Sequence, residues 1–319
     1  EKTLIIAKPD IVHCHNLFPL ITPAIYGICQ KHKIPVVQTL HNFRMQCANG
    51  LLFRNGQICE NCLTKNSTRD AIFYRCYRHS IIGSATLAHY IAYHKKHQTW
   101  RRQVNRFIAL TEFAKTKFLQ AHIEANQIDI KPNFIDMPQH SPIQQAQRSI
   151  DILYIGRFSP EKGIETLIQA SYHCQSAITV IGEGPVQLSA NNANVIPLGK
   201  MPLSDLLQHL AKAKMLVVPS IWYEHFPRVI VEAFSCGTPV ITSNIGSLAE
   251  IVQHDHNGML FEMGNSQALA KIINELLQNP AKLQALSNQA YQTYCDHYTP
   301  EKNYQQLISI YDTALSSRR

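Results

Sequence analysis

The chain has 319 residues, of which 45% are apolar, enough for two hydrophobic cores rather than one. No apolar run reaches the roughly 20 residues of a membrane-spanning helix, and the short run 4–7 is too brief for a signal peptide; we therefore expect a cytoplasmic protein. The formal net charge of +8 is uneven, since residues 1–148 hold 19 Lys/Arg against 8 Asp/Glu and residues 149–319 hold 11 against 14. This asymmetry indicates an anionic partner for the first half, or simply a solvated basic face.

The first half alternates strand-like and helical runs. The chain opens at Glu1 in what reads as the end of a helix, so we expect a first domain that is incomplete at its start. In chain order, the pattern predicts a strand at 11–15, a helix at 20–32, strands at 35–40 and 106–110, and a helix at 112–121 with Thr111 as its N-cap. Such alternation predicts a parallel sheet with crossover helices.

The Pro-, Gln- and Ser-rich segment 136–149 reads as a linker, after which a second alternating series begins. Its predicted strands are 151–156, 177–182, 195–199, 215–219 and 239–242, and its predicted helices are 160–172, 203–213, 227–236, 266–278, 280–295 and 300–316. Both halves are thus expected to be doubly wound. Ligands of such sheets bind beyond the carboxyl ends of the strands, which selects the loops after Gly156, Gly182, Pro219 and Thr242.

The loop after the first strand of the second half carries two cations, Arg157 and Lys162. Ser159 suits an N-cap and Pro160 suits the first helical position, so both cations should flank a helix N-terminus. Backbone N–H groups, the positive end of the helix and two cations suit a diphosphate. The alternative is two surface cations with no ligand.

Two carboxylates, Glu224 and Glu232, are separated by seven residues. Pro227 should start a helix that Gly237 ends. Glu232 would then lie about 7–8 Å along the helix from its start. Glu224 can reach a sugar and Glu232 a ribose, because a carboxylate accepts hydrogen bonds from vicinal hydroxyls. The alternative is an ordinary solvated pair.

The block 219–241, with Glu224 and Glu232 inside it, resembles the signature of glycosyltransferase family four, also described as glycosyl transferases group one. Further blocks at 156–162, 182–185 and 246–252, and first-domain blocks at 10–15, 39–42 and 132–136, match the family in order. The resemblance implies the α/β GT-B fold, with two Rossmann-like doubly wound domains facing a cleft. It also implies retaining sugar transfer from a UDP- or GDP-sugar donor without a catalytic metal or other cofactor.

The resemblance also implies residue roles. Arg157 and Lys162 would hold the diphosphate, Glu224 the donor sugar and Glu232 the ribose, with His41 approaching the sugar from the first domain. The remaining donor-binding positions are Gly156, Gly182, Phe226, Pro227 and Arg228. This sequence departs from the family at His225 and Ser247, where glycine is common, and it lacks a counterpart of the Gly-rich first loop.

Four cysteines form a C-x11-C-x2-C-x13-C pattern: Cys47, Cys59, Cys62 and Cys76. A C-x2-C pair with two more cysteines within 30 residues suits a closed tetrahedral zinc site of structural type. Free or redox-active thiols and another metal centre are the alternatives.

Residues 72–106 interleave aromatic and basic side chains. The aromatic members are Phe73, Tyr74, Tyr77, Tyr90, Tyr93 and Trp100, and the basic ones are Arg75, Arg78, Lys95, Lys96, Arg101, Arg102 and Arg106. The segment suits an anionic membrane surface. It also suits nucleic acid, although the donor motifs argue against a nucleic-acid partner.

Taken together, the sequence predicts a first domain at 1–148 with a cysteine-bearing insert at 44–80, a donor-binding domain at 149–298, and a C-terminal helix at 299–319 that packs back on the first domain. We expect a cytoplasmic or membrane-peripheral transferase acting on a glycan or lipid-linked acceptor in cell-surface polysaccharide biosynthesis. The rivals are a non-catalytic sugar-nucleotide-binding paralogue and a zinc-bearing nucleic-acid binder.

Overall fold

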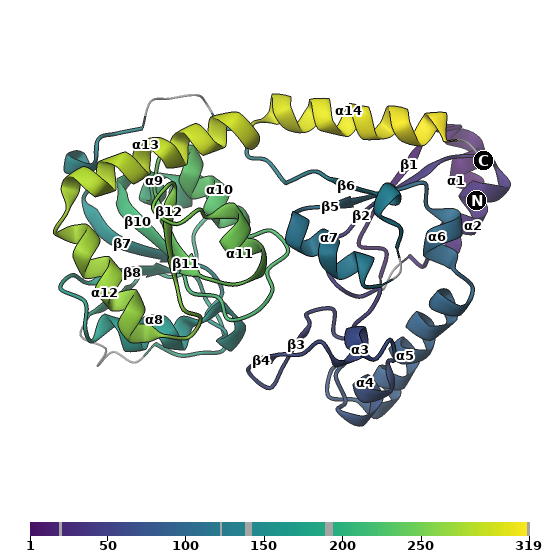
Figure 1. Ribbon diagram of the computed structural model, residues 1–319, viewed down its shortest axis with the longest axis horizontal. Helices are drawn as coiled ribbons and strands as arrows, with labels where there is room; N and C mark the ends of the chain where they lie inside the picture. Colours follow the sequence, from purple (N-terminus) through teal and green to yellow (C-terminus); the bar gives the residue numbers. More distant parts are fainter. Residues whose placement is uncertain (19–20, 122, 138–141, 189–193, 318–319) are drawn as a thin grey trace. The chain divides into compact units, whose positions relative to one another are not determined.

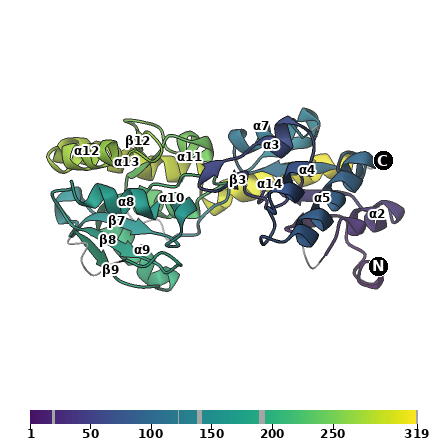
Figure 2. The same cartoon turned by 90° about the horizontal axis from the view of Figure 1, so that it is seen from below.

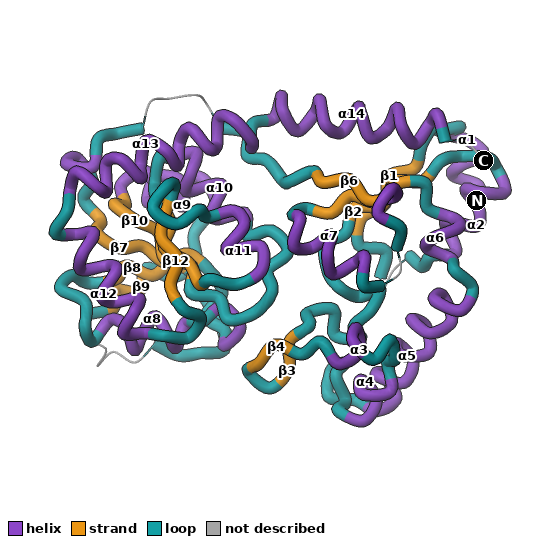
Figure 3. Tube along the Cα trace, in the orientation of Figure 1, coloured by secondary structure: helices purple, strands orange, loops and turns teal. Residues whose placement is uncertain are grey.

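The computed structural model describes residues 1–18, 21–121, 123–137, 142–188 and 194–317. The chain divides into two compact units, residues 1–132 with 303–319 (unit 1) and residues 133–302 (unit 2). Each unit is built on a parallel sheet, drawn in orange in Figure 3. No helix of the described residues is long and apolar enough to cross a bilayer.

Unit 1 contains a four-stranded parallel sheet in the order β1-β2-β5-β6. The strands are β1 (Val12–His15), β2 (Val36–Thr39), β5 (Arg106–Ala109) and β6 (Ile128–Ile130), with a separate hairpin of β3 (Phe53–Arg54) and β4 (Gln57–Ile58). The helices are α1 (Lys2–Ala7), α2 (Ala24–Lys31), α3 (Asn61–Thr64), α4 (Arg69–Phe73), α5 (Ile81–Lys96), α6 (Thr99–Gln103), α7 (Glu112–Leu119) and α14 (Pro300–Ser316), with a 3-10 turn at Ala125–Gln127.

The order of this sheet explains the position of α14 (Figure 1). Sequential parallel strands joined by right-handed crossovers place all their connecting helices on one face of the sheet. The other face needs a cover, and α14 supplies it: Ile310 and Ala314 pack against Val37 and Ile108. The N-cap of α7 matches expectation, because the Thr111 hydroxyl accepts a hydrogen bond from the Ala114 N–H.

Unit 2 contains a six-stranded parallel sheet in the order β12-β11-β10-β7-β8-β9. Its strands are β7 (Ile150–Ile155), β8 (Ile178–Ile181), β9 (Val195–Pro197), β10 (Ala213–Val218), β11 (Val240–Ser243) and β12 (Gly258–Phe261). Its helices are α8 (Ile164–Ser171), α9 (Leu203–Lys212), α10 (Arg228–Ser235), α11 (Gly246–Ile251), α12 (Ser266–Leu277) and α13 (Pro280–His297), with 3-10 turns at Gln145–Gln147 and Pro160–Lys162.

The strand order of unit 2 reverses direction at β7, so its crossovers lie on both faces of the sheet. Helices α8 and α12 pack together over one face, and α9 and α10 pack together over the other (Figures 1 and 2). The predicted linker 136–149 belongs to this unit; its residues 138–141 lie outside the described residues. Within it, Arg148 is buried and its guanidinium donates to the carbonyls of Ala213, Cys236 and Gly237.

Candidate functional site

The loops that follow β7, β8 and β10 touch one another at the carboxyl edge of the unit 2 sheet. A Cβ added to Gly163 would lie 1.8 Å from the Pro219 carbonyl oxygen, and one added to Gly182 would lie 1.9 Å from that of Gly156. Gly163 also has a φ of 70°, in the left-handed region that favours glycine. Glycine at these two positions therefore lets three strand ends meet in one place.

Lys162 and Glu224 form an ion pair at this meeting point. The Lys162 Nζ lies 2.6 Å from the Glu224 Oε1, and the Ser220 hydroxyl donates to the same oxygen at 2.8 Å. The Glu224 side chain is 8% exposed, whereas that of Lys162 is 29% exposed. Among the described residues no hydrogen bond uses Oε2 of Glu224. The carboxylate is thus fixed through one oxygen, and the other remains available for a ligand hydroxyl.

The local structure around Lys162 differs from the prediction of a helix that starts at Pro160. Residues Pro160–Lys162 form a 3-10 turn, and α8 begins only at Ile164, after Gly163. Ser159 makes no capping hydrogen bond; its hydroxyl donates instead to Glu161 at 2.7 Å. The left-handed turn at Gly163 interrupts the helix, and this turn presents Lys162 to Glu224.

Arg157, the second predicted cation, lies beside a cavity of about 840 Å³ at the ends of β7 and β8. Gly156, Gly182, Lys200 and Leu206 line the same cavity. The Arg157 side chain is exposed, while its backbone carbonyl accepts a hydrogen bond from the Tyr154 hydroxyl at 2.9 Å. A volume of this size suits a nucleotide-sized ligand.

Helix α10 carries the second predicted carboxylate. Pro227, the predicted first residue, is its N-cap, so the helix begins one residue later than predicted, and Gly237 with φ 63° follows its C-cap as predicted. Glu232 is buried, and burial raises the pKa of its carboxyl group, an effect that Arg228 at 3.9 Å opposes. Phe226 is also buried, with its ring centroid 5.9 Å from that of Tyr298.

Two further residues, which the sequence analysis did not single out, belong to the site. Ser220 donates to Glu224, and the Lys162 Nζ lies 5.5 Å from the centre of the Trp222 ring. The buried indole N–H of Trp222 has no hydrogen-bond partner among the described residues. Their positions in the loop between Pro219 and Glu224 were the available signal.

His41 lies in unit 1, in a cluster of three imidazoles. Its Nε2 is 2.7 Å from Nδ1 of His15, whose ring centroid is 4.4 Å from that of His13. His13 in turn bonds Thr39 at 2.7 Å and Tyr311 at 2.8 Å. Burial, and then the proximity of His15 and Lys131, lowers the pKa of His41 to about 4. His41 is therefore a neutral hydrogen-bonding group at pH 7.

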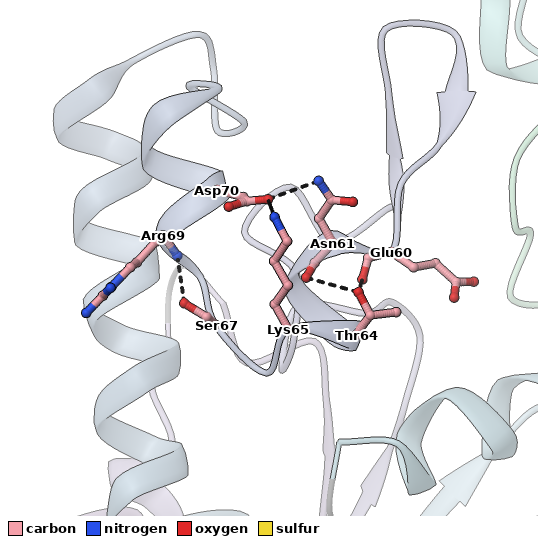
Figure 4. A network of polar contacts seen from close by, with 7 residues as sticks. All are labelled: Glu60, Asn61, Thr64, Lys65, Ser67, Arg69 and Asp70. Carbon is pink, nitrogen blue, oxygen red and sulfur yellow. Dashed lines mark hydrogen bonds and ion pairs between the residues drawn. The ribbon is translucent and has the colours of Figure 1, made fainter.

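The four clustered cysteines line one small cavity in unit 1, and the zinc site predicted for them is not shown. Within the described ranges no three His, Cys, Asp or Glu residues are placed to hold a metal ion. The Cys47 thiol instead donates to Asn49 at 2.9 Å. Asp70, the carboxylate in the lining, accepts hydrogen bonds from Lys65 and Asn61 (Figure 4). All four cysteines are free thiols.

Comparison with known proteins gives this fold a family. Two family models match: "Glycosyltransferase Family 4" over residues 2–138 and "Glycosyl transferases group 1" over residues 137–293. Two Rossmann-like parallel α/β units define the GT-B class of glycosyltransferase folds, and solved structures of that class resemble this chain. The chain belongs to the family-four GT-B glycosyltransferases.

Relatives are distant. An uncharacterized glycosyltransferase of Methanocaldococcus jannaschii, MJ1178, is 34% identical over 40% of this chain and 38% of its own length. Glycogen synthase of Mycobacterium tuberculosis is 27% identical over 89% of this chain and 64% of its own. The chain thus spans less than two thirds of either relative.

Among solved structures, HepE of Anabaena in complex with UDP has a TM-score of 0.69 and 21% identity, covering 98% of this chain and 81% of its own. Sucrose-phosphate synthase of Thermosynechococcus elongatus has a TM-score of 0.70 and 19% identity, covering 99% of this chain and 76% of its own. At this identity both show a shared fold.

Proposed function

We propose that the protein transfers a sugar, with retention of anomeric configuration, from a nucleotide-diphosphate donor to a hydroxyl of a glycan or lipid-linked acceptor. The observation that carries the proposal is the Lys162–Glu224–Ser220 arrangement at the carboxyl edge of the unit 2 sheet. It places one cation and one half-satisfied carboxylate side by side, as a diphosphate next to sugar hydroxyls requires.

In this proposal the donor diphosphate lies against Lys162 and Arg157. The bond between the anomeric carbon and the diphosphate oxygen breaks, a bond to the acceptor oxygen forms on the same face of the sugar, and the proton of the acceptor hydroxyl passes to the departing diphosphate. Negative charge then develops on the leaving diphosphate, and a preorganised cation stabilises it in the transition state. The same two cations supply the charge that a catalytic metal provides in other transferases.

Other residues bind the donor without taking part in bond making. The free Oε2 of Glu224 accepts hydrogen bonds from sugar hydroxyls, and the buried carboxylate of Glu232 accepts them from the ribose. Phe226, Pro227 and Arg228 form the loop at the N-terminus of α10, where uncapped backbone N–H groups favour an anion. For His41, whose proposed contact with the donor sugar rests on family resemblance, a neutral imidazole suits a hydroxyl partner.

The ligands of similar solved structures support the proposed donor, and the name of one relative supports the proposed pathway. The HepE structures hold UDP, or UDP with glucose, or UDP-glucose. A Bacillus subtilis relative, 27% identical over half of this chain, is named a teichuronic acid biosynthesis glycosyltransferase. We accordingly place the reaction in cell-surface polysaccharide biosynthesis.

The test is a panel of UDP-, GDP- and ADP-sugar donors. Release of nucleoside diphosphate measures turnover, and proton NMR identifies the anomeric configuration of the product first formed. Glu224→Gln should lower kcat/KM by roughly 10- to 100-fold, since a hydrogen bond to a charged group is worth about 1.5–3 kcal/mol. Glu165→Gln, on the exposed first turn of α8, is the matched control and should leave turnover intact. Release from no donor, or an inverted product, would refute the proposal.

A further inference from the structure

The turn between α4 and α5 presents large apolar side chains to solvent. Phe73 is 79% exposed and Ile82 is 80% exposed, with Ile81 at 52% and Tyr74 at 44%. We call residues 73–82 the tip. Single exposed apolar residues are ordinary on a protein surface, but a contiguous group marks an interaction site.

Cations lie between these apolar residues in the sequence, and acids are absent from this stretch. Arg75, Arg78 and His79 are exposed within the tip, each with a φ near 50° that turns the backbone between the two helices. From residue 71 to residue 111 the sequence holds seven Lys or Arg and no Asp or Glu. The acid that precedes this stretch, Asp70, is paired with Lys65 (Figure 4). The tip therefore presents exposed apolar and cationic side chains together, and its sequence contains no acid.

The rest of the segment predicted as a basic aromatic surface, 72–106, shares this character only in part. Trp100 is buried, and Tyr90 is half-buried beside a cavity. Arg106 pairs with Asp129, and Lys95 donates to Asn66 at 3.1 Å. Tyr93, at 50% exposed, and the exposed Lys96 continue this character along α5, but the most exposed apolar side chains of the segment, Phe73 and Ile82, lie in the tip.

The tip is held by packing behind it. Ala71 and Leu87 form a small core with Cys62 and Ala48, against which Tyr77 packs. The Ser80 hydroxyl caps α5 by accepting from the Gly83 N–H at 3.1 Å. Exposed side chains at 73, 75, 78 and 82 can therefore be changed without removing a core contact.

We propose that the tip inserts its apolar side chains into the headgroup region of an anionic lipid bilayer, with Arg75 and Arg78 contacting lipid phosphates. Charge complementarity selects this partner: cations gain from an anionic surface, and protruding Phe and Ile side chains gain by leaving water, as in proteins that lie on a membrane. Nucleic acid could pair with the cations through its phosphates, but it provides no apolar environment in which Ile81 and Ile82 could be buried. The proposal deepens the membrane-peripheral setting of the proposed transferase and does not depend on the donor chemistry.

The experiment is co-sedimentation of the full chain with phosphatidylcholine vesicles, with and without phosphatidylglycerol. Binding should require the anionic lipid. The double variant Phe73→Ser, Ile82→Ser should lose at least about tenfold in partitioning. Arg75→Asn and Arg78→Asn, chosen because Asn tolerates a positive φ, should each lose about fivefold on anionic vesicles. Leu203→Ser, 48% exposed in the first turn of α9, is the matched control and should bind as wild type.

Several results would overturn the proposal: no binding to anionic vesicles, equal binding by the tip variants and wild type, or binding to single-stranded RNA in place of vesicles. A concentration-dependent dimer that the Phe73→Ser, Ile82→Ser variant abolishes, without vesicle binding, would assign the tip to self-association instead. UDP titration of the same variants separates this outcome from failure of the transferase proposal, because the tip variants should bind nucleotide like wild type.

Discussion

Replacing Lys162 by alanine separates the catalytic use of the Lys162–Glu224 ion pair from its structural use. The variant leaves Glu224 with its hydrogen bond from Ser220, in a side chain that is 8% exposed. Loss of one hydrogen bond between charged groups costs about 1.5–3 kcal/mol, and the partial exposure of Lys162 points to the lower figure. Loss of a preorganised charge opposite the leaving diphosphate should lower turnover by about 10²- to 10³-fold.

The same sheet offers a matched control at its opposite edge. Asp151, near the start of β7, is paired with Lys214 at 2.6 Å and accepts a hydrogen bond from the Ser176 hydroxyl at 2.7 Å, so it also has one lysine and one serine partner. The Lys214 side chain is 31% exposed, close to the 29% of Lys162. Lys214→Ala should cost up to about 1 kcal/mol in stability and leave turnover near the wild-type rate.

Urea denaturation and nucleoside diphosphate release at a temperature where all three proteins are folded measure these effects. Turnover of Lys162→Ala within threefold of wild type, or an equal loss in Lys162→Ala and Lys214→Ala, would refute the assignment of Lys162 to the site.

Three other perturbations test the fold around the site. Gly163→Ala should destabilise unit 2 by about 3 kcal/mol, because its Cβ would overlap a carbonyl oxygen. The control Gly199→Ala, at φ 75° with open space around it, should cost about 1 kcal/mol. Thermal denaturation compares the two variants. Arg148→Met should cost about 3 kcal/mol by removing the buried hydrogen bonds of its guanidinium to the carbonyls of Ala213, Cys236 and Gly237, as seen by urea denaturation. Burial lowers the pKa of His13 and of His41 to about 4, below the unfolded value near 6.5, so the unfolded state binds more protons between these pH values. The free energy of unfolding should therefore fall by about 1 kcal/mol, discounted for solvent exposure, as pH drops from 7 to 4, and a His13→Asn, His41→Asn variant should flatten this dependence.

The parallel sheets and their ligand edge were predictable from sequence because their signals are local. Buried strands of unit 2 read as short apolar runs such as 215–218, and Gly237 marks the end of α10 as expected. The predicted start of a helix at Pro160 was wrong, because Ser159 and Pro160 carry a start signal while Gly163 adopts φ 70° to pass the Pro219 carbonyl. That close approach depends on a residue 56 positions away, which a local pattern does not contain.

The insert of unit 1 was less predictable for a related reason. Its elements are two- to five-residue pieces, β3, β4, α3 and α4, which are too short to show a periodic pattern. The cysteine spacing predicted a zinc site, yet the Cys47 thiol bonds Asn49 and Asp70 bonds Lys65, which spacing alone does not reveal. The sequence assigned Lys162 and Glu224 to one ligand site but did not predict the ion pair between them, whose two side chains lie 2.6 Å apart.

Hydrogen–deuterium exchange of the full chain with and without UDP or GDP tests the donor site most directly, because it reports where a nucleotide binds. The account predicts slower exchange, on adding the nucleotide that binds, in the three loops that meet at the carboxyl edge of the unit 2 sheet, at 156–163, 182–186 and 219–226, and no such protection in Lys162→Ala. Protection confined to the amino edge of that sheet, around Asp151 and Lys214, or protection by neither nucleotide, would contradict it.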